Sequence, residues 1–266
     1  MLKRPYVGIT GAVTTGEVDF IVRAFNHAGY SLETEHIPMI GILVSSKTLA
    51  NMSTTNRRYP NVSLLPEIFE HTQKNVFSMI HYNQSSNVTY GSLSEEIIFL
   101  FQDLYDRNLC RGLQLNIAWP KKEEVFEIKK VYPQLSIVLQ LSSTALKDKS
   151  AKDIVDCIKE YEIALDYVLI DPSGGKGKEF DFETSCEIYE EIISSQFPVR
   201  VGFAGGFSGK NVAEKCKILS ERLGTTSFCI DVEGGIRNKI TEIYGDDLLD
   251  INKVKEYVDC AKKVLL

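Results

Sequence analysis

Short apolar runs rich in β-branched residues recur along the whole chain and are typical of strands. Eight such runs are present: Pro5–Thr10, Pro38–Val44, Val76–Tyr82, Gly112–Ala118, Leu135–Leu141, Asp166–Asp171, Val199–Ala204 and Thr226–Val232. They begin roughly every 30 residues, which is the length of one strand–helix–strand unit. Because the runs are apolar almost throughout, they predict a parallel sheet that helices cover on its outer face.

Segments with helical periodicity lie between these strands. They are Val18–Ala28, Leu93–Asp106, Ala151–Glu160, Phe182–Ser195, Lys210–Leu223 and Ile251–Val264. In the first segment Phe20, Ile21, Ala24 and Phe25 share one face, and Gly29 ends it. No linker or change of composition divides the chain. Alternating units of this kind predict one α/β domain over residues 1–266, a single (β/α)8 TIM barrel with eight parallel strands.

The longest stretch without a repeat pattern is Ser45–Pro66, which follows the second strand and contains Arg57 and Arg58. Active sites of this barrel lie at the C-terminal ends of the strands. Long loops in compact domains tend to be functional. We therefore expect this loop to cover the barrel mouth and one of the two arginines to bind an anionic substrate group. A solvated basic pair is the alternative.

Polar residues two positions apart interrupt two neighbouring strands. Gln114 and Asn116 lie in the fourth strand, and Gln140 and Ser142 lie at the end of the fifth. Side chains two apart in a strand point the same way, so these point into the barrel while their apolar neighbours face the helices. The pattern favours a polar substrate pocket. Amides that bond only one another inside the barrel would give the same pattern.

Asp171 ends the sixth strand and is followed by a glycine-rich loop. A carboxylate between an apolar strand and such a loop can act as a general acid whose pKa its surroundings raise. An aspartate that starts a turn before Pro172 is the alternative. The loop Gly174–Lys178 is not a Walker motif, because Glu179 follows its last lysine and the upstream glycine is missing.

Paired glycines follow the seventh and the eighth strands. Gly205 and Gly206 follow the seventh strand, and Gly234 and Gly235 follow the eighth. Glycines let backbone N–H groups come close to an anion. Barrels of this class often bind phosphate between these two loops. The two pairs therefore predict a phosphate site, and two ordinary glycine turns are the alternative.

Composition narrows the classes of function further. The 266 residues are 44% hydrophobic and 25% charged, with a net charge of −6, so they can bury a sizeable core. No basic block indicates nucleic acid, and no apolar run reaches membrane-spanning length, so we expect neither partner and a cytoplasmic protein. Six cysteines without CxxC spacing and four scattered histidines predict no metal site, and nothing indicates a cofactor. The sequence leaves a homodimer open.

Taken in order, these strand ends resemble the phosphoribosylanthranilate isomerase family. The matching stretches are Tyr6-Val7-Gly8-Ile9-Thr10, Leu113-Gln114-Leu115-Asn116, Leu169-Ile170-Asp171 with the loop to Asp181, Ala204-Gly205-Gly206-Phe207 and Asp231-Val232-Glu233-Gly234-Gly235-Ile236. The resemblance covers nearly the whole chain. It implies an Amadori (aldose-to-ketose) isomerisation in tryptophan biosynthesis, with Asp171 as the acid and phosphate bound at the last two loops. It also implies that Arg57 or Arg58 meets the substrate carboxylate.

Two positions depart from the family pattern. The cysteine that serves as its base is matched by Val7, and its fourth-strand histidine is matched by Asn116. Since valine cannot take a proton, the resemblance leaves the base unassigned. His81 ends the third strand and is a candidate base, or else a structural histidine. Three functions stay open: an isomerase with a relocated base, another phosphosugar epimerase, aldolase or lyase, and a non-catalytic phosphate-binding barrel.

Overall fold

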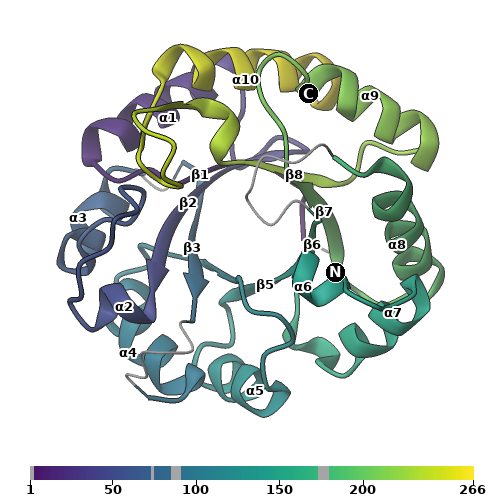
Figure 1. Cartoon of the computed structure of the whole chain (residues 1–266), viewed down its shortest axis with the longest axis horizontal. Coiled ribbons are helices and arrows are strands. Elements are labelled where there is room, and N and C mark those ends of the chain that lie inside the picture. Colours follow the sequence, from purple (N-terminus) through teal and green to yellow (C-terminus); the bar gives the residue numbers. More distant parts are fainter. Residues whose placement is uncertain (1–2, 73–74, 85–90, 173–179) are drawn as a thin grey trace.

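The predicted strands form a closed parallel barrel in the computed structural model, which describes residues 3–72, 75–84, 91–172 and 180–266. The strands are β1 (Tyr6–Thr10), β2 (Ile37–Ser45), β3 (Phe77–Asn83), β4 (Gly112–Leu115), β5 (Ser136–Ser142), β6 (Tyr167–Asp171), β7 (Arg200–Ala204) and β8 (Cys229–Val232). Each strand pairs with its neighbours in chain order, and β8 closes the ring against β1 (Figure 1). The predicted (β/α)8 barrel is confirmed. The loop Gly174–Lys178 lies outside the described residues.

Helices surround the barrel (Figure 1). They are α1 (Thr15–Ala28), α2 (Ser46–Leu49), α3 (Leu65–Glu70), α4 (Leu93–Asp106), α5 (Lys122–Val131), α6 (Ser143–Leu146), α7 (Ala151–Lys159), α8 (Phe182–Ser194), α9 (Val212–Leu223) and α10 (Ile251–Leu265), with the 3-10 turns η1 (Val62–Leu64), η2 (Glu162–Ala164) and η3 (Gly234–Ile236). Capping boxes at Thr14, Ser92 and Ser150 start α1, α4 and α7. The Thr14 box explains why α1 begins three residues before its apolar pattern. None of the helices described has the length and apolar composition that crossing a membrane requires.

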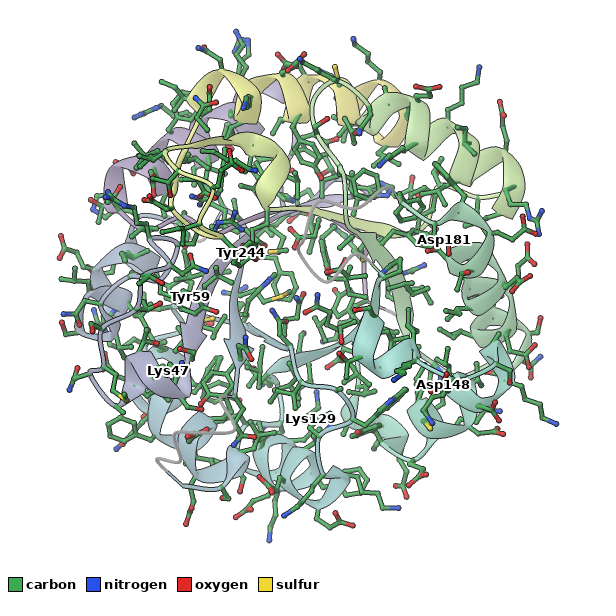
Figure 2. All side chains as sticks on the ribbon, in the orientation of Figure 1. Lys47, Tyr59, Lys129, Asp148, Asp181 and Tyr244 are labelled. Carbon is green, nitrogen blue, oxygen red and sulfur yellow. The ribbon has the colours of Figure 1, made fainter. Side chains whose placement is uncertain are left out.

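Side chains fill the middle of the barrel, so it is a packed core and not a pore (Figure 2). At its N-terminal end the rings of Tyr6, Phe77 and Tyr167 lie together, with the Phe77 and Tyr167 centroids 6.0 Å apart. Met39, Met79, Val138, Leu169 and Cys229 continue this apolar filling. The polar inward-facing residues are therefore confined to the C-terminal end.

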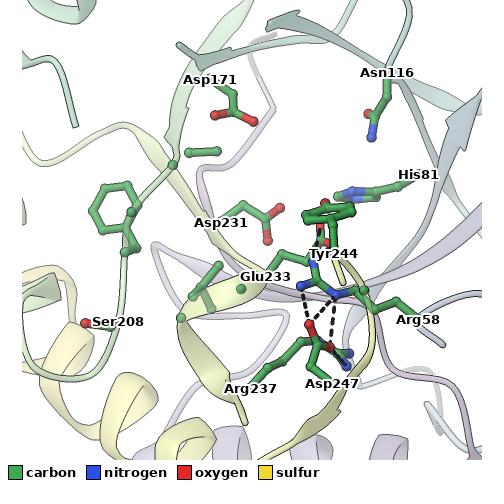
Figure 3. Close-up of a pocket in the computed structure, with 18 of the residues that line it drawn as sticks. Arg58, His81, Asn116, Asp171, Ser208, Asp231, Glu233, Arg237, Tyr244 and Asp247 are labelled. Atoms are coloured by element: carbon green, nitrogen blue, oxygen red, sulfur yellow. Dashed lines mark hydrogen bonds and ion pairs between the residues drawn. The ribbon is translucent and has the colours of Figure 1, made fainter. Parts of the chain in front are cut away.

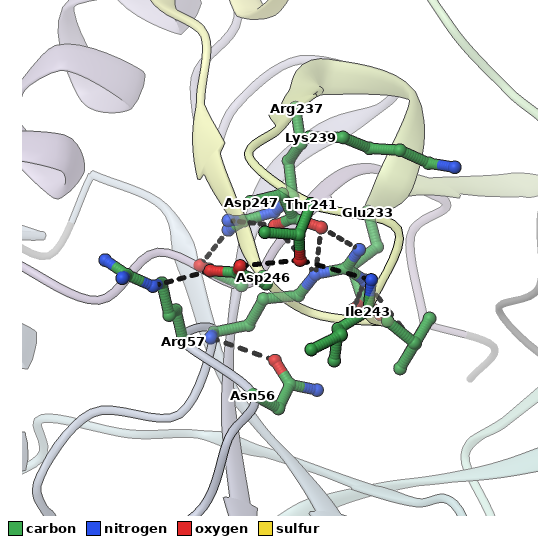
Figure 4. A network of polar contacts seen from close by, with 12 residues as sticks. Asn56, Arg57, Glu233, Arg237, Lys239, Thr241, Ile243, Asp246 and Asp247 are labelled. Atoms are coloured by element: carbon green, nitrogen blue, oxygen red, sulfur yellow. Dashed lines mark hydrogen bonds and ion pairs between the residues drawn. The ribbon is translucent and has the colours of Figure 1, made fainter.

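The structure contains a small hairpin after β8 that the apolar pattern does not predict. Its strands β9 (Arg237–Lys239) and β10 (Asp247–Leu249) pair antiparallel. The hairpin lies beside the long loop after α2, because the Arg57 N–H donates to the Gly245 carbonyl oxygen at 2.9 Å. Figure 4 shows Asn56 and Arg57 against this hairpin. Two segments far apart in the sequence thus meet at one side of the barrel mouth.

Candidate active site

A cavity of about 490 Å³ opens at the C-terminal ends of the strands. It is lined by ten of the residues that the sequence nominates: Arg58, His81, Gln114, Asn116, Gln140, Asp171, Gly205, Gly206, Gly234 and Gly235. They come from β3, β4, β5 and β6 and from the loops after α2, β7 and β8. The fold therefore brings together in one cavity what the sequence spreads over nearly 180 residues.

The two adjacent arginines have different surroundings. The Arg57 guanidinium is more than half exposed, pairs with Asp246 at 2.7 Å, and does not line the cavity. Arg58 is buried, and its Nε donates to Asp247 Oδ1 at 3.0 Å. The other Arg58 nitrogens bond Asp247 and Glu233, and the guanidinium lies 4.8 Å from the Tyr244 ring centroid (Figure 3). Arg58 thus reaches the mouth, but protein carboxylates already bind it.

Asp247 holds two buried arginines at once. Its carboxylate accepts from Arg58 and also from Arg237 Nη1 at 3.2 Å (Figure 3). Burial disfavours the charged Asp247 carboxylate, but the hydrogen bonds and charges of Arg58 and Arg237 outweigh burial and lower its pKa. Arg237 Nη2 also donates to the carbonyl oxygen of Gly11. This network joins the hairpin, the loop after α2 and the end of β1.

A second buried chain of hydrogen bonds runs along the wall of the cavity. Gln114 Nε2 donates to His81 Nδ1 at 3.1 Å, so His81 Nε2 carries the proton and faces Thr10 Oγ1 at 3.5 Å. Thr10 then donates to Asp231, at 2.9 and 3.0 Å from its two carboxylate oxygens. Gly41 leaves room for this contact, because a Cβ there would lie 2.5 Å from Thr10 Oγ1. Asp231 is thereby fixed at the cavity.

The two titratable groups of this chain shift in opposite ways. Burial lowers the pKa of His81 to about 3, so its ring is neutral at physiological pH. Burial raises the pKa of Asp231 well above its ordinary value, and the charges of Glu233 and Asp171 add to that rise. With both ring nitrogens facing protein partners, His81 is poorly suited to be a base. Its contacts indicate a positioning role toward Thr10 and Asp231.

The shifted pKa of His81 predicts a pH dependence of stability. The folded protein excludes the His81 proton down to about pH 3, whereas the unfolded chain takes it up near pH 6.5. Stability is therefore full above pH 6.5 and is lost as the pH falls toward 3. Urea unfolding at pH 7.5 and pH 5 is expected to show a loss about 2 kcal/mol larger in the wild type than in His81→Gln. Equal losses in both proteins would contradict the shift.

The glycine loops after β7 and β8 pack against each other. A Cβ on Gly235 would lie 1.9 Å from the carbonyl oxygen of Phe207, whereas a Cβ on Gly234 would meet nothing within 4 Å. Gly205 and Gly206 have positive φ angles of 97° and 65°. No hydrogen bond from the N–H of Gly206, Gly234 or Gly235 to another described residue is present. The loops thus leave backbone donors at the cavity wall.

Side chains at the start of α9 hold the first of these loops in shape. Asn211 Oδ1 accepts from the Ser208 N–H at 2.8 Å, and Asn211 Nδ2 donates to the Gly206 carbonyl oxygen at 2.9 Å. Lys215 Nζ donates to the same oxygen at 2.8 Å. Asn211 has a φ of −128°, outside the helical range, so α9 begins at Val212 and not at Lys210 as the sequence predicts.

The position of Val7 corrects the expectation drawn from the first-strand motif. Val7 pairs with Pro38 and Ile230 and packs in the layer between barrel and helices, whereas Gly8 and Thr10 face inward. A thiol introduced by Val7→Cys would therefore lie outside the cavity and could not supply a base there. The residue of β1 that faces the cavity wall is Thr10.

Several residues of the site were not among those that the sequence analysis nominates. They are Thr10, Asp231, Glu233, Arg237, Tyr244 and Asp247. Alternation along the strand is a signal that could have found Asp231, since Cys229 and Asp231 both point inward. The hairpin residues carry no comparable signal. Within the described part of the chain, no group of three or more His, Cys, Asp or Glu side chains could hold a metal ion.

Comparison with known proteins supports the fold and no finer assignment. No protein-family model matches the chain, and no curated protein matches it in sequence. Among solved structures, a Rubisco-like protein from Rhodopseudomonas palustris is similar, with a TM-score of 0.60 and 7% identity. The match covers 98% of this chain and 63% of the Rubisco-like protein. The catalytic domain of a hyperthermophilic chitinase from Pyrococcus furiosus is also similar, with a TM-score of 0.57 and 10% identity. The match covers 99% of this chain and 97% of the chitinase domain. Tryptophan synthase subunit alpha from Legionella pneumophila str. Paris is similar too, with a TM-score of 0.58 and 12% identity. The match covers 98% of this chain and 92% of that subunit. These neighbours are barrel proteins that differ in function.

Proposed function

We propose that this chain is a barrel enzyme that binds a phosphorylated sugar derivative and interconverts its aldose and ketose forms. One observation carries the proposal. Two buried carboxylates, Asp171 and Asp231, line the same cavity as the two glycine loops after β7 and β8. Isomerisation of a sugar phosphate requires a site that binds the phosphate and an acid–base pair in the same cavity. The resemblance of the strand ends to phosphoribosylanthranilate isomerase points the same way.

The phosphate half of the proposal uses the two glycine loops. N–H groups of Gly206 and Gly234 that bond no described residue can donate to phosphate oxygens. Gly234 and Gly235 are the first two residues of the 3-10 turn η3, and their N–H groups have no partner inside that turn. Gly234 borders the cavity with open space around the position of a Cβ. A side chain is thus absent at the point where a phosphate would approach.

The acid–base half assigns a proton carrier to each carboxylate. Asp171 accepts from Gln140 Nε2 at 2.7 Å and takes the role of the acid that protonates the sugar ring oxygen. Asp231 takes the role of the base that neither Val7 nor His81 can fill. It removes the proton from C2 of the opened sugar, the electron pair forms the C1=C2 bond of an enediol, and the C1 oxygen takes up a proton. Return of a proton to C1 with loss of the O2 proton then gives the ketose. Burial raises the pKa of Asp231, which makes its ionised form a stronger base.

The phosphate site is tested by a pair of adjacent glycines. Millimolar ribose 5-phosphate is expected to raise the melting temperature of the wild type by several degrees, since ligand at 100 times Kd adds about 2.7 kcal/mol. Gly234→Ala is expected to fold normally and lose most of this rise, because its Cβ enters open cavity space. Gly235→Ala is expected to lower the melting temperature without ligand, because its Cβ meets the Phe207 carbonyl oxygen.

Ribose without phosphate is the ligand control, and it is expected to leave the melting temperature unchanged. If ribose 5-phosphate and ribose act alike on the wild type, the phosphate site is wrong. If Gly234→Ala keeps the full rise, a phosphate binds elsewhere.

A further inference from the structure

One buried acceptor at the cavity has no hydrogen-bond partner among the described residues. Gln114 is 1% exposed and lines the cavity, and both hydrogens of its amide nitrogen are used, on His81 Nδ1 and on Asn116 Oδ1 at 2.8 Å. Its Oε1 is buried and accepts no hydrogen bond from any residue that the structure describes. A buried carbonyl oxygen without a donor is costly, so this atom indicates a ligand that brings a donor to it.

Carboxylates surround the same space. Asp171 and Asp231 are both buried and line the same cavity, and the Asp171 charge adds to the rise in the pKa of Asp231. Figure 3 shows both pointing into the cavity, with Ser208 on one side of them and His81 and Asn116 on the other. A positive charge between two such carboxylates would relieve their repulsion.

Protein acceptors already bind most nitrogens of the two cavity arginines. The Nε and both terminal nitrogens of Arg58 donate hydrogen bonds to Asp247 and Glu233. Arg237 bonds Asp247 and the Gly11 carbonyl oxygen through its two terminal nitrogens, and only its Nε has no partner among the described residues. A substrate carboxylate would have to displace buried protein carboxylates from these arginines. Lys239 and Glu242, the other charged residues at the rim, carry opposite signs and lie on the hairpin.

We propose that the part of the cavity bordered by Asp171, Asp231 and Gln114 binds a protonated amine on the sugar phosphate. An ammonium group has three donors and one positive charge, which suit two carboxylates and one amide oxygen. A hydroxyl would supply a donor without the charge. The inference rests on the proposed function, because the glycine loops place the ligand by its phosphate. It replaces the carboxylate that the family resemblance implies with a group of opposite charge.

Calorimetric titration with three phosphorylated ligands tests this inference. Glucosamine 6-phosphate and glucose 6-phosphate differ only in an amine or a hydroxyl at C2, and 6-phosphogluconate carries a carboxylate. The wild type is expected to bind the amine at least tenfold more tightly than the hydroxyl compound, and the carboxylate most weakly. Asp231→Asn is expected to bring the amine-to-hydroxyl ratio close to one. Gln114→Leu is expected to lower it, whereas Gln114→Glu should preserve or raise it.

Asp246→Asn is the matched control, because Asp246 pairs with Arg57 outside the cavity and its loss should leave the ratio unchanged. Melting temperatures of all variants establish that they fold. Equal affinity of the wild type for the amine and the hydroxyl compound, or preference for 6-phosphogluconate, would overturn the inference and leave the phosphate site standing. Failure of all three ligands and of ribose 5-phosphate to bind would overturn the proposed function, and the inference with it.

Discussion

Arg58→Ala is expected to destabilise the fold by about 3–5 kcal/mol, whereas Arg57→Ala is expected to cost no more than about 1 kcal/mol. Arg58 is 4% exposed, and its removal leaves Glu233 without its cation and Asp247 with Arg237 alone. Arg57 is exposed and pairs with Asp246 at the surface, where water screens the charges. Urea unfolding monitored by circular dichroism measures both.

This comparison uses two residues of one type, adjacent in the chain, so differences in composition or in the unfolded state largely cancel. Equal costs for the two variants would mean that the buried network does not hold the hairpin to the barrel. The cost of Arg58→Ala should also shrink in a protein that already carries Asp247→Leu, because the two side chains act through the same contacts.

Replacing either cavity carboxylate is expected to slow turnover strongly with the fold intact. Asp171→Asn and Asp231→Asn should each lower kcat by about 10²–10⁴, since each removes one proton carrier of the proposed pair. The assay follows ketose formation from ribose 5-phosphate and from phosphoribosylanthranilate. Asp166→Asn is the control: Asp166 lies at the opposite end of β6, where it accepts from Lys129 Nζ at 2.8 Å.

The control variant is expected to keep the wild-type kcat. Turnover that survives in Asp231→Asn would remove Asp231 from the role of base. Wild-type protein that binds these phosphates but converts neither would favour the non-catalytic phosphate-binding barrel over the isomerase.

The barrel could be predicted from the sequence because eight mostly apolar runs recur at regular spacing, and segments with helical periodicity follow six of them. Such runs depend on local composition, and the structure places all eight of them in chain order. The hairpin could not be predicted in this way. Its strands are three residues long, and the Arg58–Asp247 contact that anchors it joins residues 189 positions apart.

The strand-end motifs predict residues that line the cavity, but β1 differs from the motif in which residue faces inward. Gly234, Gly235 and Asp171 lie at the C-terminal ends of strands. In a parallel barrel all these ends meet at the mouth, so their place follows from the strand order. Aligning Val7 with the family cysteine ignored alternation along β1, which turns Val7 outward and Thr10 inward. Nor could the sequence distinguish Arg57 from Arg58, because only the folded hairpin buries one of them.

The central claim is that the loops after β7 and β8 hold the phosphate of a sugar ligand, and a crystal structure with ribose 5-phosphate tests it most directly. The account predicts a phosphorus atom between Gly206 and Gly234, within hydrogen-bond reach of their N–H groups, with the sugar extending toward Asp171 and Asp231. Ribose 5-phosphate bound with its phosphate against Arg58 and Arg237, or outside this cavity, would contradict it.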